Sequence, residues 1–229
     1  YPTRVGQVTA YYTVSMVAAA ALALALNVPL ANAGLGWAGA MVIWGAAVVI
    51  TLLVWRKNAA LRLSGGTPEE APAPRTPLWK SGLAWCVTLF FGINSLIFYA
   101  VIGWLPTILQ SGGMAGSTAG AVTSLYQVVS LLPSLLVPAL AGKCRDQRGW
   151  LLLGSVLNII GIGMLMFSTA AGVQIAATAI LGLANGCAFS MGLALMGFRA
   201  RDAVDAARLS GFAQSVGYAL AATGPLVVG

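Results

Sequence analysis

The chain has 229 residues, of which 59% are hydrophobic and 7% are charged, and its formal net charge is +7. A soluble domain carries about a quarter charged residues, so this composition excludes an ordinary water-soluble domain and indicates a membrane protein. The chain has no histidine, and none of its long apolar runs contains aspartate or glutamate, so the usual groups of an intramembrane metalloenzyme are missing. We therefore expect no catalytic residue, no metal site and no cofactor.

Seven apolar segments follow one another, each near the length of about 20 residues that a helix needs to cross a bilayer. They comprise residues 8–30, 36–55, 81–109, 117–141, 150–168, 173–198 and 209–229. The stretch over 56–80 contains four prolines and predicts a polar linker with little helix. The sequence therefore predicts an all-α membrane protein with seven transmembrane helices: two in 1–55 and five in 81–229. Because Tyr1 is not an initiator Met and no signal peptide precedes the first segment, we interpret the chain as an internal piece of a longer protein.

The basic residues fall on alternate connections between these segments. Arg4 precedes the first segment, and every other lysine and arginine lies within 56–80, 142–149 or 199–208. Short cytoplasmic loops retain lysine and arginine, so we place these three loops in the cytoplasm of a multi-pass protein of the bacterial inner (plasma) membrane. The positive charge is then a signal of topology, and no nucleic acid is expected as a partner.

Polar side chains are concentrated on some of the expected helices and scarce on others. The segments 36–55 and 150–168 are nearly free of them, which is typical of helices that face lipid. The other segments carry seven candidates for binding a solute: Asn94, Tyr99, Tyr126, Gln127, Asn185, Gln214 and Tyr218. Taken singly, each fits a hydrogen bond between helices, whereas the set as a whole favours a polar pathway through the bundle.

Glycines and prolines inside the segments predict where helices touch or bend. Gly182 and Gly186 are four residues apart and share one helix face, which a neighbouring helix can approach closely. Pro106, Pro133 and Pro138 each remove a backbone donor and bend their helices. For Pro133 and Pro138, a simple bend and a flexing gate are equally compatible with the sequence.

The connection that reads Gly-Lys-Cys-Arg-Asp-Gln-Arg-Gly resembles the signature loop of the major facilitator superfamily. The resemblance implies a helical bundle of the major facilitator type, with roughly helices five to eleven of a twelve-helix transporter in this chain. It assigns four residues to a loop that acts on the conformational equilibrium: Gly142, Asp146, Arg148 and Gly149. Gln147 departs from the family pattern, which often has a basic residue there.

Two further stretches of sequence resemble one subfamily in particular. The residues from Trp85 to Pro106, and those from Ala206 to Tyr218 followed by Gly224-Pro225, are similar to the seventh and eleventh helices of the cyanate and 2-nitroimidazole transporter subfamily. Since the family's seventh and tenth helices line the cavity, Asn94, Tyr99 and Asn185 would belong to its wall. The other four candidates would lie on flanking helices.

The resemblance implies a secondary active transporter, not an enzyme, that moves a small polar or weakly acidic solute across the inner membrane by alternating access. Its partners would be this solute and membrane lipid. A proton is one candidate coupling ion, although no carboxylate lies inside a segment to carry it. The alternative is a seven-helix membrane receptor or sensor, which the helix count invites. A retinal-binding receptor is disfavoured, because no segment contains a lysine that could form the Schiff base.

Overall fold

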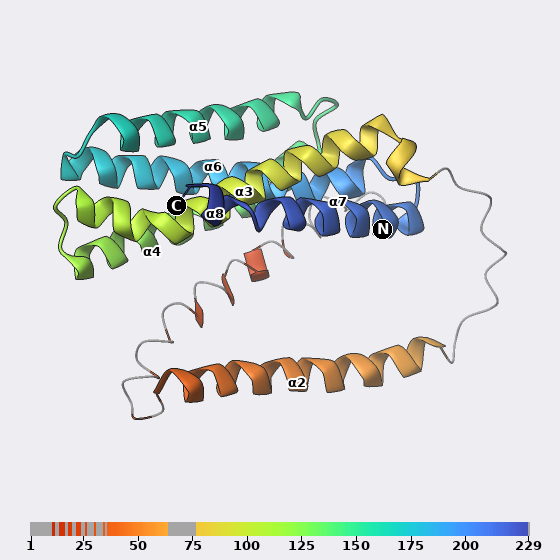
Figure 1. Ribbon diagram of the computed structural model, residues 1–229. Coiled ribbons are helices and arrows are strands. Elements are labelled where there is room, and N and C mark those ends of the chain that lie inside the picture. Colours follow the sequence, from red (N-terminus) through yellow and green to blue (C-terminus); the bar gives the residue numbers. More distant parts are fainter. Residues whose placement is uncertain are drawn as a thin grey trace. The chain divides into compact units, whose positions relative to one another are not determined.

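The computed structural model describes residues 36–63 and 77–228, together with scattered positions between residues 11 and 34. These residues form helices joined by short turns, and no strand occurs among them (Figure 1). The chain divides into two units, one of Tyr1–Ala19 with Pro77–Gly229 and the other of Ala20–Thr76.

Helices account for the fold of both units. The smaller unit contains α2 (Gly36–Leu63). In the larger unit a short 3-10 helix, η3 (Leu78–Lys80), is followed by α3 (Gly82–Ser111), α4 (Gly116–Ala141), α5 (Arg148–Phe167), α6 (Ala171–Phe198), α7 (Ala203–Ala221) and α8 (Gly224–Val228). Among the described residues, α2 to α6 are long and apolar enough to cross a membrane. The predicted all-α membrane fold is confirmed, while the first expected segment, 8–30, lies almost entirely outside the described residues.

The helix α2 extends past the apolar run from which it was predicted. It continues beyond Trp55 to Leu63, through residues that had been assigned to the linker. Seven of the eight residues over 56–63 are arginine, lysine, alanine or leucine, all of which have high helix propensity, so the positive charge does not end the helix.

The last expected segment, 209–229, also differs from the structure. α7 begins earlier, at Ala203, because the side chain of Asp202 accepts a hydrogen bond from the backbone N–H of Asp205 and caps the helix. The segment is then interrupted between Ala221 and Gly224, so α7 and α8 are separate helices.

α6 is the central helix of the larger unit and packs against α4 and α5 on different faces (Figure 1). Its contact with α4 depends on small residues. A Cβ atom at Gly182 would lie 2.6 Å from the carbonyl oxygen of Tyr126, and one at Gly186 would meet the carbonyl oxygen of Ser130. The predicted close approach at this glycine pair is confirmed, because a larger side chain at either position would force the two helices apart.

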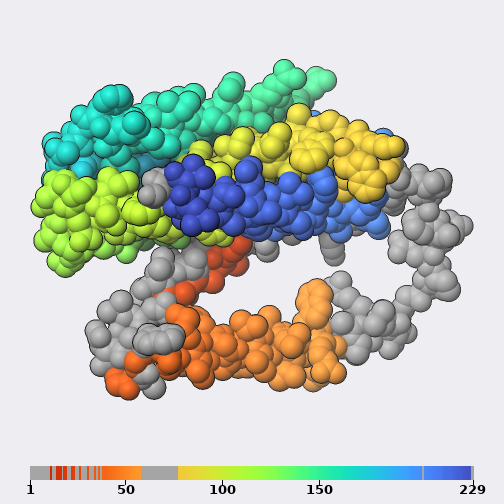
Figure 2. Space-filling model, in the orientation of Figure 1, coloured from red at the N-terminus to blue at the C-terminus, as the bar shows by residue number. Residues whose placement is uncertain are grey.

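α5 packs on α6 along one face and leaves its other face exposed, where it forms the outer row of side chains in Figure 2. Ile159 is 72% exposed and Phe167 is 89% exposed. An apolar face of this kind suits lipid. The inner face of the same helix carries one buried polar residue, Asn158, which the overall plainness of the segment did not distinguish.

α3 lies beside α7 and α8 on the face shown in Figure 2. The backbones of α3 and α7 cross closely at two glycines, since a Cβ atom at Gly92 would lie 3.0 Å from the Cα atom of Gly217. This crossing determines which side chains of the two helices meet.

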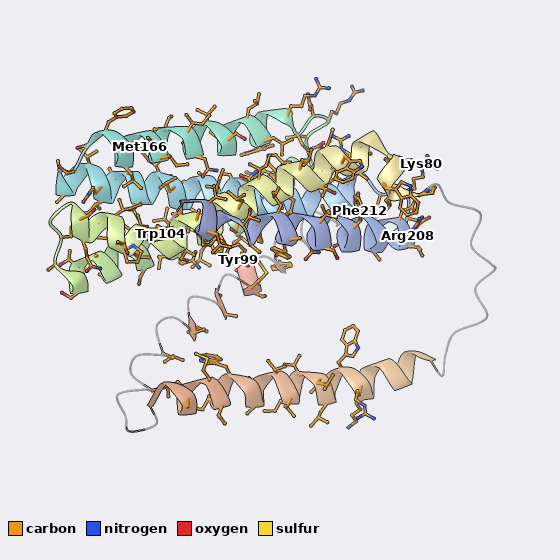
Figure 3. All side chains as sticks on the ribbon, viewed as in Figure 1. Lys80, Tyr99, Trp104, Met166, Arg208 and Phe212 are labelled. Atoms are coloured by element: carbon orange, nitrogen blue, oxygen red, sulfur yellow. The ribbon has the colours of Figure 1, made fainter. Side chains whose placement is uncertain are left out.

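Basic residues gather at one end of the larger unit. Lys80 and Arg208 lie toward that end in Figure 3, and Met166 lies toward the other. The Nη2 atom of Arg199 donates a hydrogen bond of 3.1 Å to Oε1 of Gln147. The connections 142–149 and 199–208 are therefore neighbours at the same end of the bundle.

Candidate functional site

Six aromatic side chains from four helices form one continuous cluster in the larger unit. They are Phe91, Phe98 and Tyr99 of α3, Tyr126 of α4, Phe189 of α6 and Tyr218 of α7. The ring centroids of Phe98 and Tyr126 are 6.1 Å apart, and those of Tyr99 and Tyr218 are 6.5 Å apart. The structure therefore brings together three of the seven predicted site residues, all of them tyrosines.

Phe91 fixes the positions of its neighbours in the cluster, because its ring is fully buried between glycines of two helices. A Cβ atom at Gly192 of α6 would lie 3.0 Å from one ring carbon of Phe91, and a Cβ atom at Gly217 of α7 would lie 2.8 Å from another. The ring of Tyr218 meets that of Phe91 edge to face, with centroids 5.2 Å apart. The glycines thus decide how close Tyr218 comes to α3.

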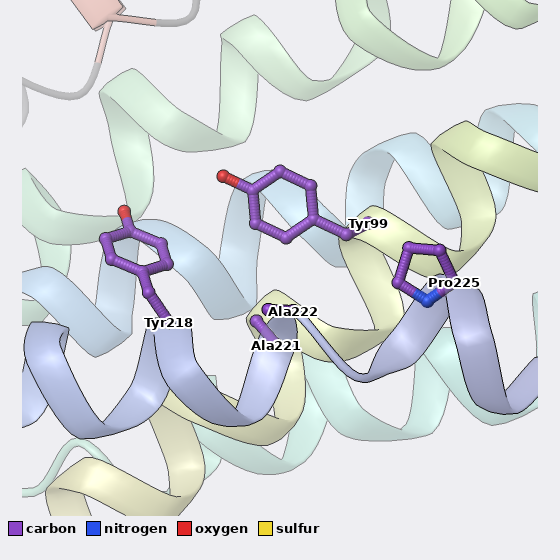
Figure 4. Close-up of a pocket in the computed structure, with 5 residues that line it drawn as sticks. All are labelled: Tyr99, Tyr218, Ala221, Ala222 and Pro225. Carbon is purple, nitrogen blue, oxygen red and sulfur yellow. The ribbon is translucent and has the colours of Figure 1, made fainter.

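A pocket of about 310 Å³ lies at one edge of this cluster. Tyr99, Tyr218, Ala221, Ala222 and Pro225 line it, so α3, α7 and the start of α8 all contribute (Figure 4). The two phenol rings stand as walls of the pocket, and the pyrrolidine ring of Pro225 lies near Tyr99. No charged side chain is among the lining residues. The pocket offers aromatic and apolar faces to a ligand.

The interruption between α7 and α8 shapes one wall of the pocket. Pro225 has no N–H, so α7 cannot continue through it with unbroken hydrogen bonds. The chain turns at Ala222 and Thr223, where both the backbone N–H and the hydroxyl of Thr223 donate to the carbonyl of Leu220. The indole N–H of Trp104 on α3 donates to the carbonyl oxygen of Pro225 at 3.0 Å, which fastens α8 to α3.

Asn94 has a different environment from the tyrosines. Its Nδ2 donates 2.8 Å to the carbonyl of Phe90 in its own helix, and its Oδ1 accepts from Nδ2 of Asn158 on α5 at 3.5 Å. Both asparagines are buried. In this structure Asn94 links α3 to α5 and is not among the residues that line the pocket.

The remaining predicted residues are divided between the core and the helix surface. Gln127 is buried on α4 with its Oε1 atom unpaired among the described residues, and Asn185 is buried on α6. Gln214 donates from Nε2 to the hydroxyl of Ser210 at 2.6 Å, one turn earlier in α7. None of the three lines the pocket.

The sequence interpretation missed three of the lining residues, Ala221, Ala222 and Pro225. A signal for Pro225 was present, because the pair Gly224-Pro225 lies inside an apolar run and predicts a break in the helix. Alanines give no such signal, and only the position of the break shows that they line a pocket.

The model of the Major Facilitator Superfamily matches residues 1–225 of the chain. The chain belongs to the major facilitator superfamily. This agrees with the resemblance of its 142–149 connection to the signature loop, and the receptor alternative is not favoured.

Three relatives show where in this superfamily the chain lies. Over the whole chain it is 39% identical to a 2-nitroimidazole transporter of Escherichia coli (strain K12), of which it covers 58%. It is 37% identical to the uncharacterized transporter YycB of Bacillus subtilis (strain 168), again over the whole chain and covering 57% of that protein. Over 82% of the chain it is 25% identical to the cyanate transport protein CynX of Escherichia coli (strain K12), of which it covers 48%. The chain thus spans about half the length of these relatives, and no solved structure matches it.

The 142–149 connection, which resembles the superfamily's signature loop, has a defined local geometry. Asp146 accepts a hydrogen bond from the backbone N–H of Arg148 at 3.0 Å, and its carboxylate lies 3.9 Å from that residue's Nε. Gly142 and Gly149 are both exposed. Gln147, which replaces the usual basic residue, donates from Nε2 to the carbonyl of Cys144 at 2.9 Å while accepting from Arg199. The amide therefore connects the end of α4 to the end of α6, a role that the sequence did not suggest.

Proposed function

We propose that the protein is a secondary active transporter that moves a small, flat, polar or weakly acidic solute across the bacterial inner membrane by alternating access. The observation that carries this proposal is the pocket between Tyr99 and Tyr218, in a chain that belongs to a superfamily of transporters. In this proposal the division at 56–80 separates the two halves that move against each other. The connections 56–80, 142–149 and 199–208 face the cytoplasm.

The chemistry of the pocket supports a flat solute. Two phenol rings supply faces and edges on which a planar molecule can stack, and their hydroxyl groups supply polar contacts at the ring rims. No charged side chain among the described lining residues would balance a full charge on the solute, which favours a neutral or weakly acidic one. The 2-nitroimidazole named for one relative is a molecule of this kind. A proton stays a candidate coupling ion, with no carboxylate in the apolar segments assigned to it.

Uptake by the full-length protein in sealed vesicles tests the proposal, with 2-nitroimidazole as the first probe and cyanate as the second. We expect the protein to move at least one of them, and the Tyr99→Ala variant to lose about tenfold or more in apparent affinity, because it removes a wall of the pocket. The control is Phe167→Ala at the exposed end of α5, which should behave as wild type. Failure of the folded protein to move either probe, or equal behaviour of the two variants, would contradict the proposal.

A further inference from the structure

The pocket between α3, α7 and α8 has a mostly apolar surface. The described residues that line it are two tyrosines, two alanines and a proline, so none of them is charged (Figure 4). The faces of aromatic rings carry a negative electrostatic potential, so they stabilise a stacked neutral ring better than a stacked anion. A pocket of this kind removes water from an anionic solute and provides no cation in its place.

The charged side chains of the surrounding helices lie away from the pocket. Neither α3 nor α8 contains a charged residue, and α4 and α6 contain none either. In α7 the charged residues are Asp205 and Arg208, whose side chains approach each other to 3.6 Å. Arg208 precedes Tyr218 by ten residues, which is about 15 Å along a helix. The other titratable side chains of these five helices carry no positive charge in any protonation state: Cys86, Tyr99, Tyr126, Cys187 and Tyr218.

We propose that a weakly acidic solute binds in its neutral, protonated form, and that the proton on the solute is the proton that crosses the membrane with it. The apolar segments of this chain contain no carboxylate, and transport of this kind requires none, because the proton stays on the acidic atom of the solute. In water on the far side the neutral solute dissociates into one proton and one anion. This inference rests on the proposed function and adds to it the protonation state of the solute and the carrier of the proton.

The dependence of affinity on pH is the first test. The probes are 2-nitroimidazole, whose ring N–H is acidic, and 1-methyl-2-nitroimidazole, which has no acidic proton. Affinities are measured on the purified full-length protein from well below to well above the pKa of 2-nitroimidazole. Since only the neutral fraction binds, its apparent Kd should be constant below that pKa and rise about tenfold per pH unit above it. The N-methyl compound reports any titration of the protein, and its affinity should stay constant.

The absorption spectrum of the bound solute shows where the proton lies. Affinity alone does not, because an anion bound beside a protonated side chain contains the same atoms as the neutral solute bound to the unprotonated protein. Loss of the ring proton shifts the absorption band of 2-nitroimidazole, so the two forms are distinguishable. At a pH above the pKa of the free compound, the bound compound should keep the spectrum of the neutral form. An anion spectrum for the bound compound would overturn the inference.

A cation introduced at Ala222 tests the cause of the preference. Ala222 is exposed and lines the pocket, so Ala222→Lys brings a flexible ammonium group to it. We expect this variant to bind the anion of 2-nitroimidazole about tenfold or more tightly than wild type does, because the ammonium group balances the charge. The matched control is Ala222→Met, which adds an unbranched side chain without charge and should keep the preference for the neutral form. A folded lysine variant that still rejects the anion would contradict the inference.

The outcomes for wild type separate this inference from the function on which it rests. Equal affinity for 2-nitroimidazole below and above its pKa would overturn the inference and leave the transporter in place, since a cation elsewhere in the full-length protein would then balance the anion. This measurement needs no variant, so it stands even if a substitution prevents folding. Failure of wild type to bind either compound would contradict the proposed solute class and the inference together.

Discussion

Glycines bring two pairs of helices into close contact, and the two contacts differ in what lies beside them. Between α4 and α6, Gly182 and Gly186 face the backbone of an unbroken helix that runs past them. Between α3 and α7, Gly92 meets Gly217, and one turn farther α7 ends at Ala221. The first contact buries small residues, whereas the second leads directly to the pocket.

The comparison separates two uses of close helix packing. The α4–α6 contact holds the core of the unit, because without a hydrophobic driving force in lipid, close van der Waals packing stabilises helix association. The α3–α7 contact positions Tyr218, which forms one wall of the pocket, because Gly217 sets the distance of Tyr218 from Phe91. Changes at the first contact should therefore affect folding, and changes at the second should affect ligand binding.

The largest effect is expected for Gly186→Leu in the α4–α6 contact. Even a Cβ atom at this position would meet the carbonyl oxygen of Ser130, so a leucine must push α4 away. Overpacking costs typically about 1–3 kcal/mol, and the loss of several backbone contacts adds to it. We expect the variant to purify as aggregated protein or to unfold at a clearly lower temperature. Gly163→Leu, where nothing lies within 4 Å of the added Cβ atom, is the control and should remain stable.

Gly217→Ala should reduce solute affinity more than it reduces thermal stability. The added methyl group would lie 2.8 Å from a ring carbon of Phe91, which must shift and displace the neighbouring Tyr218. We expect solute affinity to fall by about fivefold or more while the melting temperature falls only slightly. Gly211→Ala in the same helix is the matched control, because its Cβ atom meets no other atom within 4 Å. A large loss of stability with unchanged affinity of the folded fraction would remove the distinction between the two contacts.

The sequence predicted the first of these regions better than the second. The spacing of Gly182 and Gly186 is local and predicts a smooth helix face without knowledge of the partner. The aromatic cluster depends on which residues of α3, α6 and α7 meet, and this is decided by packing between segments far apart in the chain. Periodicity shows that Tyr99 and Tyr218 are on helices but not that their rings lie 6.5 Å apart.

Asn94 illustrates the same limit for polar residues. A single asparagine in an apolar helix fits a bond between helices better than a binding role, and only the set of polar residues favoured the binding role. Its bond to Asn158 is visible only in three dimensions, because α5 was expected to face lipid.

A smaller effect is expected for Trp104→Phe, which keeps an aromatic ring and removes the indole N–H that donates to Pro225. Loss of this neutral hydrogen bond should cost about 1 kcal/mol and loosen the attachment of α8 to α3. Because Pro225 lines the pocket, we expect affinity to fall by about two- to fivefold. Trp85→Phe removes a comparable indole bond, to the carbonyl of Trp79 at the far end of α3, and should leave affinity unchanged. Equal effects of the two variants on binding would show that the attachment of α8 does not shape the pocket.

The smallest effect on stability and on binding is expected for Asp146→Asn in the signature loop. The side chains of Asp146 and Arg148 are 66% and 86% exposed, and an exposed pair of this kind contributes about 0–1 kcal/mol because water screens it. The melting temperature and the solute affinity should therefore change little. If the loop acts on the equilibrium between inward- and outward-facing states, the rate of transport should nevertheless fall, because the carboxylate would make its decisive contacts in only one of those states. Measuring the uptake rate and the affinity on the same preparation separates the two effects.

Arg199→Gln, which breaks the bond from α6 to Gln147 without touching the carboxylate, provides the comparison. An unchanged uptake rate in Asp146→Asn would mean that the loop only connects α4 to α5.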